Sequence, residues 1–176
     1  MKRKNYMKYY LLTVICFFVC CYGVAEQKNP KMKKMIEESL QTIESSENWK
    51  TNKGKIVEAL KIISQEGVTN AIPILIPNVS FTPVDTPDFT MGNIDRVYPV
   101  VTCLKELGEA STQGIIVYVV DSKHPLTEPM VMNLKRVLIG VEGLEGAHNI
   151  ISDAIKKEAA AEKQNRLKVL LPDLTE

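Results

Sequence analysis

Apolar residues recur at three- and four-residue steps along most of the chain, and this spacing predicts amphipathic helices. Polar residues fill the other positions of each turn, so each predicted helix has one face suited to a core. The helices are expected over about residues 30–44, 53–66, 97–107, 127–142, 147–157 and 158–171.

The stretch from Asp95 to Asp121, DRVYPVVTCLKELGEASTQGIIVYVVD, is the unit around which the chain is organised. It is typical of two short helices folded back on each other, and Gly108 stands where a left-handed residue ends the first of them. The inward stripe of that first helix is predicted to be Val97, Val100, Val101, Leu104 and Leu107.

Residues with special backbone preferences mark the other helix ends. Asn29-Pro30 is a helix start, because Asn can cap exposed N–H groups and Pro fits the first helical position. Gly67 is expected to end the helix that begins near Lys53, while Gly143 and Gly146 mark a later turn. Pro172 should stop the last helix.

Two segments are ambiguous between helix and strand. IIVYVV, residues 115–120, is β-branched and aromatic, and AIPILIP, residues 71–77, is similarly apolar. If both were strands, the chain would alternate strand and helix and form an α/β domain. Helix propensities differ by only a few tenths of a kcal/mol among such residues, so burial between helices can override them. The helical interpretation is favoured.

The connections differ in length. Residues 45–52 are polar and form a predicted connector anchored by Trp49. Residues 78–94 are a long connection, interpreted as an insertion between repeats, in which Phe81 and Phe89 are candidate clamps on the core. Asn78-Val79-Ser80 matches a glycosylation acceptor triplet, which matters only in a eukaryotic secretory pathway.

Residues 1–25 have the layout of a secretory signal peptide. A basic leader precedes an apolar run, and Gly23 and Ala25 are small residues that would allow cleavage before Glu26. The apolar core is shorter than the roughly 20 residues that span a bilayer, which argues against an uncleaved anchor. A lipoprotein cut before Cys20 or Cys21 is the weaker third option. Export to the periplasm or the medium is therefore predicted, without membrane insertion after cleavage.

Removing residues 1–25 changes the charge and the cysteine content. The remaining 151 residues are enough for one domain with a core, and they carry 18 basic and 21 acidic residues, a net charge of −3. No basic face interleaved with aromatics is evident, so nucleic-acid binding has no support. Cys103 is the only cysteine left, which excludes an internal disulfide, and it is expected to be a small buried apolar residue.

The chain contains internal similarity. IVEALKIISQEGVTNAIPILI from Ile56 aligns with VYPVVTCLKELGEASTQGIIV from Val97 at an offset of 41 residues, which places Gly67 opposite Gly108. A looser third copy, VLIGVEGLEGAHNIISDAI, starts at Val137 and has Gly143 in that position. A period near 40 residues with two helices per unit is typical of HEAT and armadillo repeats.

These segments resemble the degenerate HEAT-like repeats of exported bacterial proteins. The resemblance covers roughly residues 53–171 and implies an all-α fold, a short α-solenoid of antiparallel helix pairs. Residues 26–52 would then form an N-terminal helix and connector, and residues 172–176 a tail. The resemblance implies a scaffold or partner-binding role and carries no catalytic residues, because the positions of the motif are core and turn positions.

Candidate chemistry is sparse. His124 and His148 lack neighbours at metal-ligand spacing, and no nucleophile elbow, phosphate loop or zinc signature occurs. A carbohydrate site around Trp49 is not favoured. A rim of carboxylates is the remaining candidate for acid–base chemistry, and these residues are expected to be solvated: Glu106, Glu109, Asp121 and Glu128.

The sequence thus predicts a non-enzymatic exported helical-repeat domain that binds an unidentified protein partner, with no catalytic, cofactor-binding or metal-binding residues. The alternatives are a small exported α/β enzyme and a structural envelope component with no discrete ligand. No residue is assigned to the partner surface beyond the expectation that it is the concave side of the stack.

Overall fold

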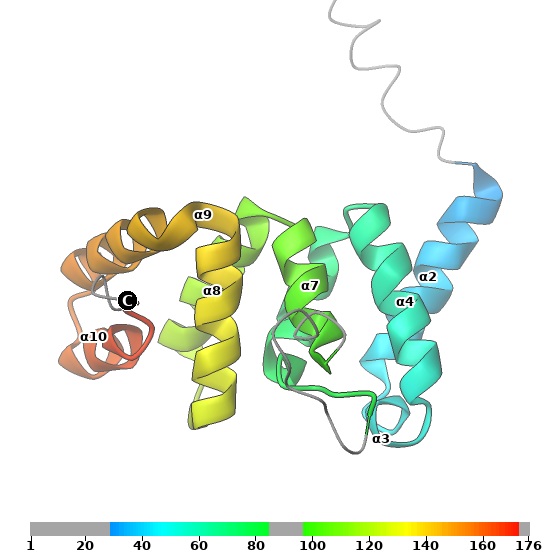
Figure 1. Cartoon of the computed structure of the whole chain (residues 1–176), viewed down its shortest axis with the longest axis horizontal. Helices are drawn as coiled ribbons and strands as arrows, with labels where there is room; N and C mark the ends of the chain where they lie inside the picture. The colour runs from blue at the N-terminus through cyan, green and yellow to red at the C-terminus, as the bar shows by residue number, and fades with distance from the viewer. Residues whose placement is uncertain (1–28, 85–96, 173–176) are drawn as a thin grey trace, which may run out of the picture. The chain divides into compact units, whose positions relative to one another are not determined.

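A computed structural model describes residues 29–84 and 97–172. Within these ranges the protein is all-α, and no residue is in a strand. The all-α prediction is confirmed, and the α/β alternative is wrong. The α-helices of the described ranges (Figure 1) are α2 Pro30–Glu44, α3 Asn48–Thr51, α4 Lys53–Gln65, α5 Ile72–Leu75, α7 Pro99–Glu106, α8 Glu109–Asp121, α9 Glu128–Lys157 and α10 Ala161–Lys168.

The chain divides into two compact units, residues 1–34 and 35–176. Of the first unit, the structure describes only the cap and the first residues of α2. There the Lys31 N–H donates to the Asn29 side-chain oxygen at 3.0 Å, which confirms Asn29 as a helix cap. The remaining features belong to the second unit.

Gly67 ends α4 as predicted. Its φ is +63°, and its N–H donates to the Ser64 carbonyl at 3.1 Å. The Val68 N–H reaches back to the Ile63 carbonyl at 2.9 Å, so the two bonds form a Schellman cap. Val68 and Ile63 are both buried, which adds the apolar contact that usually accompanies this cap.

Gly108 separates α7 from α8. Its φ of 65° and ψ of −143° lie in a region that only glycine adopts without strain. The Gly108 N–H donates to the Lys105 carbonyl, and its own carbonyl accepts from Ser111 at 2.8 Å. Residues 115–120 lie within α8, so this β-branched run is helical, in agreement with the favoured interpretation.

In the first of the aligned segments, which starts at Ile56, the part that corresponds to α8 has a different secondary structure. Residues 69–78 form two 3₁₀ turns, Thr69–Ala71 and Ile76–Asn78, on either side of the four-residue α5. Pro73 and Pro77 each occupy an early position of one of these pieces, where a missing N–H costs least. The two prolines therefore divide one helix into three short turns that still bury Ile72, Leu75 and Ile76.

The long helix α9 contains a kink at Gly143, where φ is 74° and ψ is 168°. The kink separates a first half, residues 128–142, from a second half, residues 144–157. Figure 1 shows the two halves running in clearly different directions. Gly143 is thus a turn residue as predicted, whereas Gly146 has no positive φ.

The last helix is shorter than the predicted 158–171. Glu158 and Ala160 are extended, and α10 begins at Ala161. The Glu158 side chain accepts the Ala160 N–H at 3.0 Å, and its carbonyl accepts the Gln164 amide at 2.7 Å. These local hydrogen bonds replace those of a helix and allow the chain to reverse direction between α9 and α10. Helix propensity alone does not predict this reversal.

The core forms where α7 packs against α4, α5 and α9. Figure 1 shows α7 between α4 and the first half of α9. All five residues of the predicted inward stripe are buried. Further along, α8 packs against α5, α9 and α10. The largest fully buried side chains are Ile43, Ile56, Ile63, Leu75, Ile76, Leu104, Ile115, Leu134, Leu138, Ile151, Leu167 and Leu170.

Trp49 anchors the connector between α2 and α4, as predicted. The connector also contains the single turn α3, which the sequence pattern did not predict. The Trp49 indole N–H donates to the Ile43 carbonyl at 2.8 Å, and its ring meets Phe81 edge-on with centroids 5.0 Å apart. Phe81 is thus confirmed as a clamp on the core.

Replacing Gly108 with alanine should lower the free energy of unfolding by about 1–3 kcal/mol, because its backbone conformation is strained for any residue with a Cβ. Gly54 is the matched control. It lies in the first turn of α4 with open space around it, and Gly54→Ala should raise stability by about 0.4–1 kcal/mol. Urea denaturation measures both. Equal changes in the free energy of unfolding for the two variants would contradict the strained conformation assigned to Gly108.

Candidate functional site

A groove of about 460 Å³ lies between α8 and the second half of α9; we call it the α8 groove. Its walls carry residues at helical spacing, with Ile116 and Val120 on α8 facing Ile150 and Ala154 on α9. Leu167 of α10 also contributes. The complete lining is Gln113, Ile116, Val117, Val120, Asp121, Ile150, Asp153, Ala154, Lys157, Glu158 and Leu167.

The α8 groove exists because residues 115–120 are apolar on every side of the helix. Six consecutive apolar residues cover more than one face, so no single core can bury them all. Ile115 and Val119 face the core and are fully buried, whereas Val117 faces outward with 59% of its surface exposed. An apolar strip on α8 is therefore left accessible along the groove.

Charged groups surround one end of this strip. Asp121 pairs with Lys163 at 3.1 Å, and Asp153 pairs with Lys156 at 3.0 Å. The hydrogen bond to Asp121 raises the pKa of Lys163, and the bond from Lys156 lowers the pKa of Asp153. These pairs are exposed, so each adds little to stability, yet they give the groove a polar rim.

A second groove of about 490 Å³ lies between α4 and α7, beside Pro83. It too has helical stripes on both walls, with Val57 and Leu60 on α4 and Thr102 and Cys103 on α7. This groove is mainly apolar, and its volume would suit a small apolar ligand.

Cys103 behaves as a small apolar residue. Only 2% of its surface is exposed, and burial, with a smaller effect from Glu106, raises the pKa of its thiol from 9.0 to about 12. The thiol is therefore protonated near neutral pH and is a poor nucleophile.

The other residues considered for chemistry are dispersed. His124 is exposed, and the His148 Nδ1 lies 3.3 Å from the Pro172 carbonyl oxygen. Glu106 lines the groove between α4 and α7, Asp121 lines the α8 groove, and Glu109 and Glu128 line neither. Within residues 29–84 and 97–172, no three His, Cys, Asp or Glu side chains are grouped as a metal site requires.

The structure places two further candidates from the sequence, Trp49 and the acceptor triplet at residues 78–80. Trp49 is 9% exposed, so its ring offers no open platform for a sugar. In the acceptor triplet, the Asn78 amide donates to the Ile74 carbonyl at 2.9 Å and Val79 is fully buried. The folded chain therefore holds this triplet in a helical turn.

Several predictions fall outside the described residues. These are the signal peptide over 1–25, most of the 78–94 connection including Phe89, the start of the organising unit at Asp95, and residues 173–176 of the tail. Of the helices that the structure does describe, none combines the length and apolar character needed to cross a membrane.

Comparisons with family models, curated proteins and solved structures give no match to this chain.

Sequence reasoning missed the α8 groove although it had singled out the run at residues 115–120 and Asp121, which form one of its walls. The available signal is the apolar run at residues 115–120. Once it is helical, an apolar run around the whole circumference predicts an exposed strip. Arg166 of α10 donates to the Val119 carbonyl at 2.7 Å and to the His124 carbonyl at 3.0 Å. No sequence signal predicts these contacts, because the acceptors are backbone carbonyls distant along the chain.

Stability should fall between pH 9 and 12 through Cys103. The unfolded thiol loses its proton near pH 9, whereas the buried thiol keeps it to about pH 12, so the native state binds more protons in this window. The contribution is up to about 1.4 kcal/mol per pH unit. The measurement is urea denaturation of the original protein and of Cys103→Ala at pH 8, 9 and 10. The difference between their free energies of unfolding isolates the contribution of the thiol. Parallel curves for the two proteins would refute this role of Cys103.

Proposed function

We propose that the protein is an exported, non-enzymatic helical-repeat domain that binds a protein partner through the α8 groove. One observation carries the proposal, namely the apolar strip on α8 with Val117 mostly exposed at its edge. Exposed apolar strips bordered by charged residues are typical of protein interaction sites. The helical spacing on both walls suits an amphipathic helix of the partner.

The repeat interpretation has two supports. Gly67, Gly108 and Gly143 occupy equivalent places in the three aligned segments, and in residues 29–84 and 97–172 they are the glycines with positive φ. Elements at equivalent places also pack together, since α4 contacts α7, α7 contacts α9, and α5 contacts α8. Such packing of like elements is expected of a HEAT-like array. The array would span residues 53–171.

Export is proposed from the sequence of residues 1–25, with action in the periplasm or outside the cell. The domain relies on its apolar core rather than on disulfides. This is compatible with an oxidising compartment, because its cysteine, Cys103, is buried.

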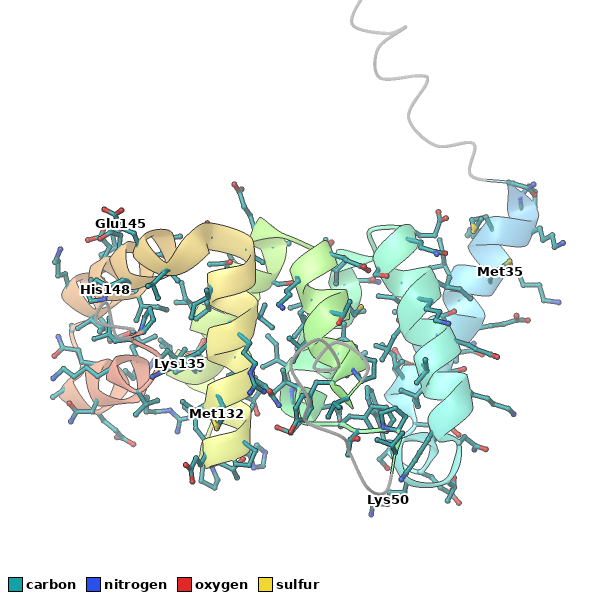
Figure 2. All side chains as sticks on the ribbon, in the orientation of Figure 1. Met35, Lys50, Met132, Lys135, Glu145 and His148 are labelled. Carbon is teal, nitrogen blue, oxygen red and sulfur yellow. The ribbon has the colours of Figure 1, made fainter. Side chains whose placement is uncertain are left out.

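Val117→Lys should weaken partner capture at least tenfold, since it places a charge in the apolar strip. Because Val117 is exposed, stability should change by no more than about 0.5 kcal/mol. Met132→Lys is the matched control, because Met132 is 48% exposed on the first half of α9 (Figure 2) and does not line the α8 groove.

The measurement is affinity capture with cross-linking from an envelope extract, using residues 26–176 as bait. The proposal requires that the unchanged bait reproducibly recovers one protein. The Met132→Lys variant should retain this protein, and the Val117→Lys variant should lose it. Equal recovery by both variants would place the partner elsewhere, and no recovery by the unchanged bait would argue against a binding function.

A further inference from the structure

The first turns of α2 combine lysines with apolar side chains. Residues 27–36 contain four lysines and no acidic residue, although residues 26–176 together have a net charge of −3. Three of these lysines, Lys31, Lys33 and Lys34, lie in α2 and are exposed. The acidic residues of α2 begin only at Glu37, so positive charge is concentrated at the start of this helix.

The Asn29 cap determines which side chains share a face of α2. The Asn29 carbonyl accepts the Met32 N–H at 2.7 Å and the Lys33 N–H at 3.1 Å, so these residues are helical from the first turn. Met32 and Met35 are three residues apart and therefore lie on one face of the helix. Lys31 and Lys33, the residues before and after Met32, flank this face on its two sides.

The apolar face of α2 extends beyond the core. Towards the C-terminal end of the helix Ile43 is fully buried, while Ile36 and Leu40 pack against the core. Met32 and Met35 (Figure 2) are half-buried and, among the described residues, are not part of that core. The first turns of α2 are therefore left with accessible apolar surface that lysines flank.

From this arrangement we infer that the first turns of α2 bind the surface of an anionic lipid bilayer. Apolar side chains flanked by lysines are typical of helices that lie in the interfacial plane of a membrane. The lysines contact the lipid phosphates, and Met32 and Met35 enter the boundary between headgroups and acyl chains. With 15 residues, α2 is shorter than a membrane span, so it lies along the surface rather than across the bilayer.

Two features favour lipid over another polyanion. A nucleic acid would pair with the lysines through its phosphates, but its backbone offers no apolar layer to the adjacent methionines. Residues 30–36 also follow closely after residues 1–25, the segment predicted to engage a membrane during export. This inference goes beyond the proposed function and is independent of it, because the lipid surface shares no residue with the α8 groove and requires no protein partner.

The test is co-sedimentation of residues 26–176 with vesicles. This form contains every described residue and lacks the apolar run within residues 1–25, which would itself favour lipid. Vesicles of equal parts phosphatidylglycerol and phosphatidylcholine should sediment the protein at about 0.05 M salt and release most of it at about 0.5 M salt, because salt screens the lysines. Vesicles of phosphatidylcholine alone should not sediment it. Equal binding to both vesicle types, or binding to neither, would overturn the inference.

The double variant Lys31→Gln, Lys33→Gln removes the two flanking charges. Binding to the phosphatidylglycerol vesicles should weaken about tenfold or more, since each lysine near an anionic surface strengthens binding about fivefold. The matched control is Lys50→Gln with Lys55→Gln, which removes the same charge from exposed positions of α3 and α4 (Lys50 in Figure 2) and should bind as the original protein does. Equal weakening in both double variants would overturn the inference, because net charge would then govern binding.

A dye on the apolar face reports whether this face meets lipid. Cys103 is buried, so a thiol-reactive NBD dye labels Met32→Cys selectively. With phosphatidylglycerol vesicles its emission should increase and shift to shorter wavelength, because the dye leaves water. The same dye on Lys50→Cys is the control and should not respond. Unchanged emission from position 32 in protein that sediments with the vesicles would overturn the inference, because another surface would then hold the lipid.

Discussion

The burial of α7 between its neighbours is the interaction on which the other helices depend. Eight residues are too few for a helix to be stable alone in water, so α7 persists because α4, α5 and α9 surround it. Val100, Val101 and Leu104 are fully buried. Truncating one such leucine typically costs about 2–5 kcal/mol, a large part of the total stability of an ordinary domain.

The turns are specified by the backbone rather than by side chains. Gly108 and Gly143 adopt conformations that residues with a Cβ resist, and each lets the chain change direction within a single residue. The last carbonyls of α4 are satisfied by the Schellman bonds at Gly67, and near the end of α8 the Val119 carbonyl accepts a hydrogen bond from the Arg166 side chain. At these glycines the helices are joined by very short connections, which keeps their apolar faces adjacent.

Most of the fold could be predicted from the sequence, because periodicity and glycine position act locally. The buried stripe of α7, the cap at Gly67 and the helical state of residues 115–120 all follow from such local signals. The start of α10 could not be predicted, since a reversal overrides the strong helix propensity of residues 158–160. The α8 groove was harder to predict than the helices, because a groove depends on which helix faces remain uncovered after packing.

Trp49 is the only tryptophan of the chain, and its position limits what intrinsic fluorescence can report. Its indole contacts the end of α2 and Phe81, whereas α10 packs on α8 and α9. Emission would therefore follow the disassembly of the region around α2 to α4 and would not report a change confined to α8, α9 and α10. A melting curve recorded by fluorescence and one recorded by circular dichroism need not coincide, and any gap between them would measure how far the two regions unfold independently.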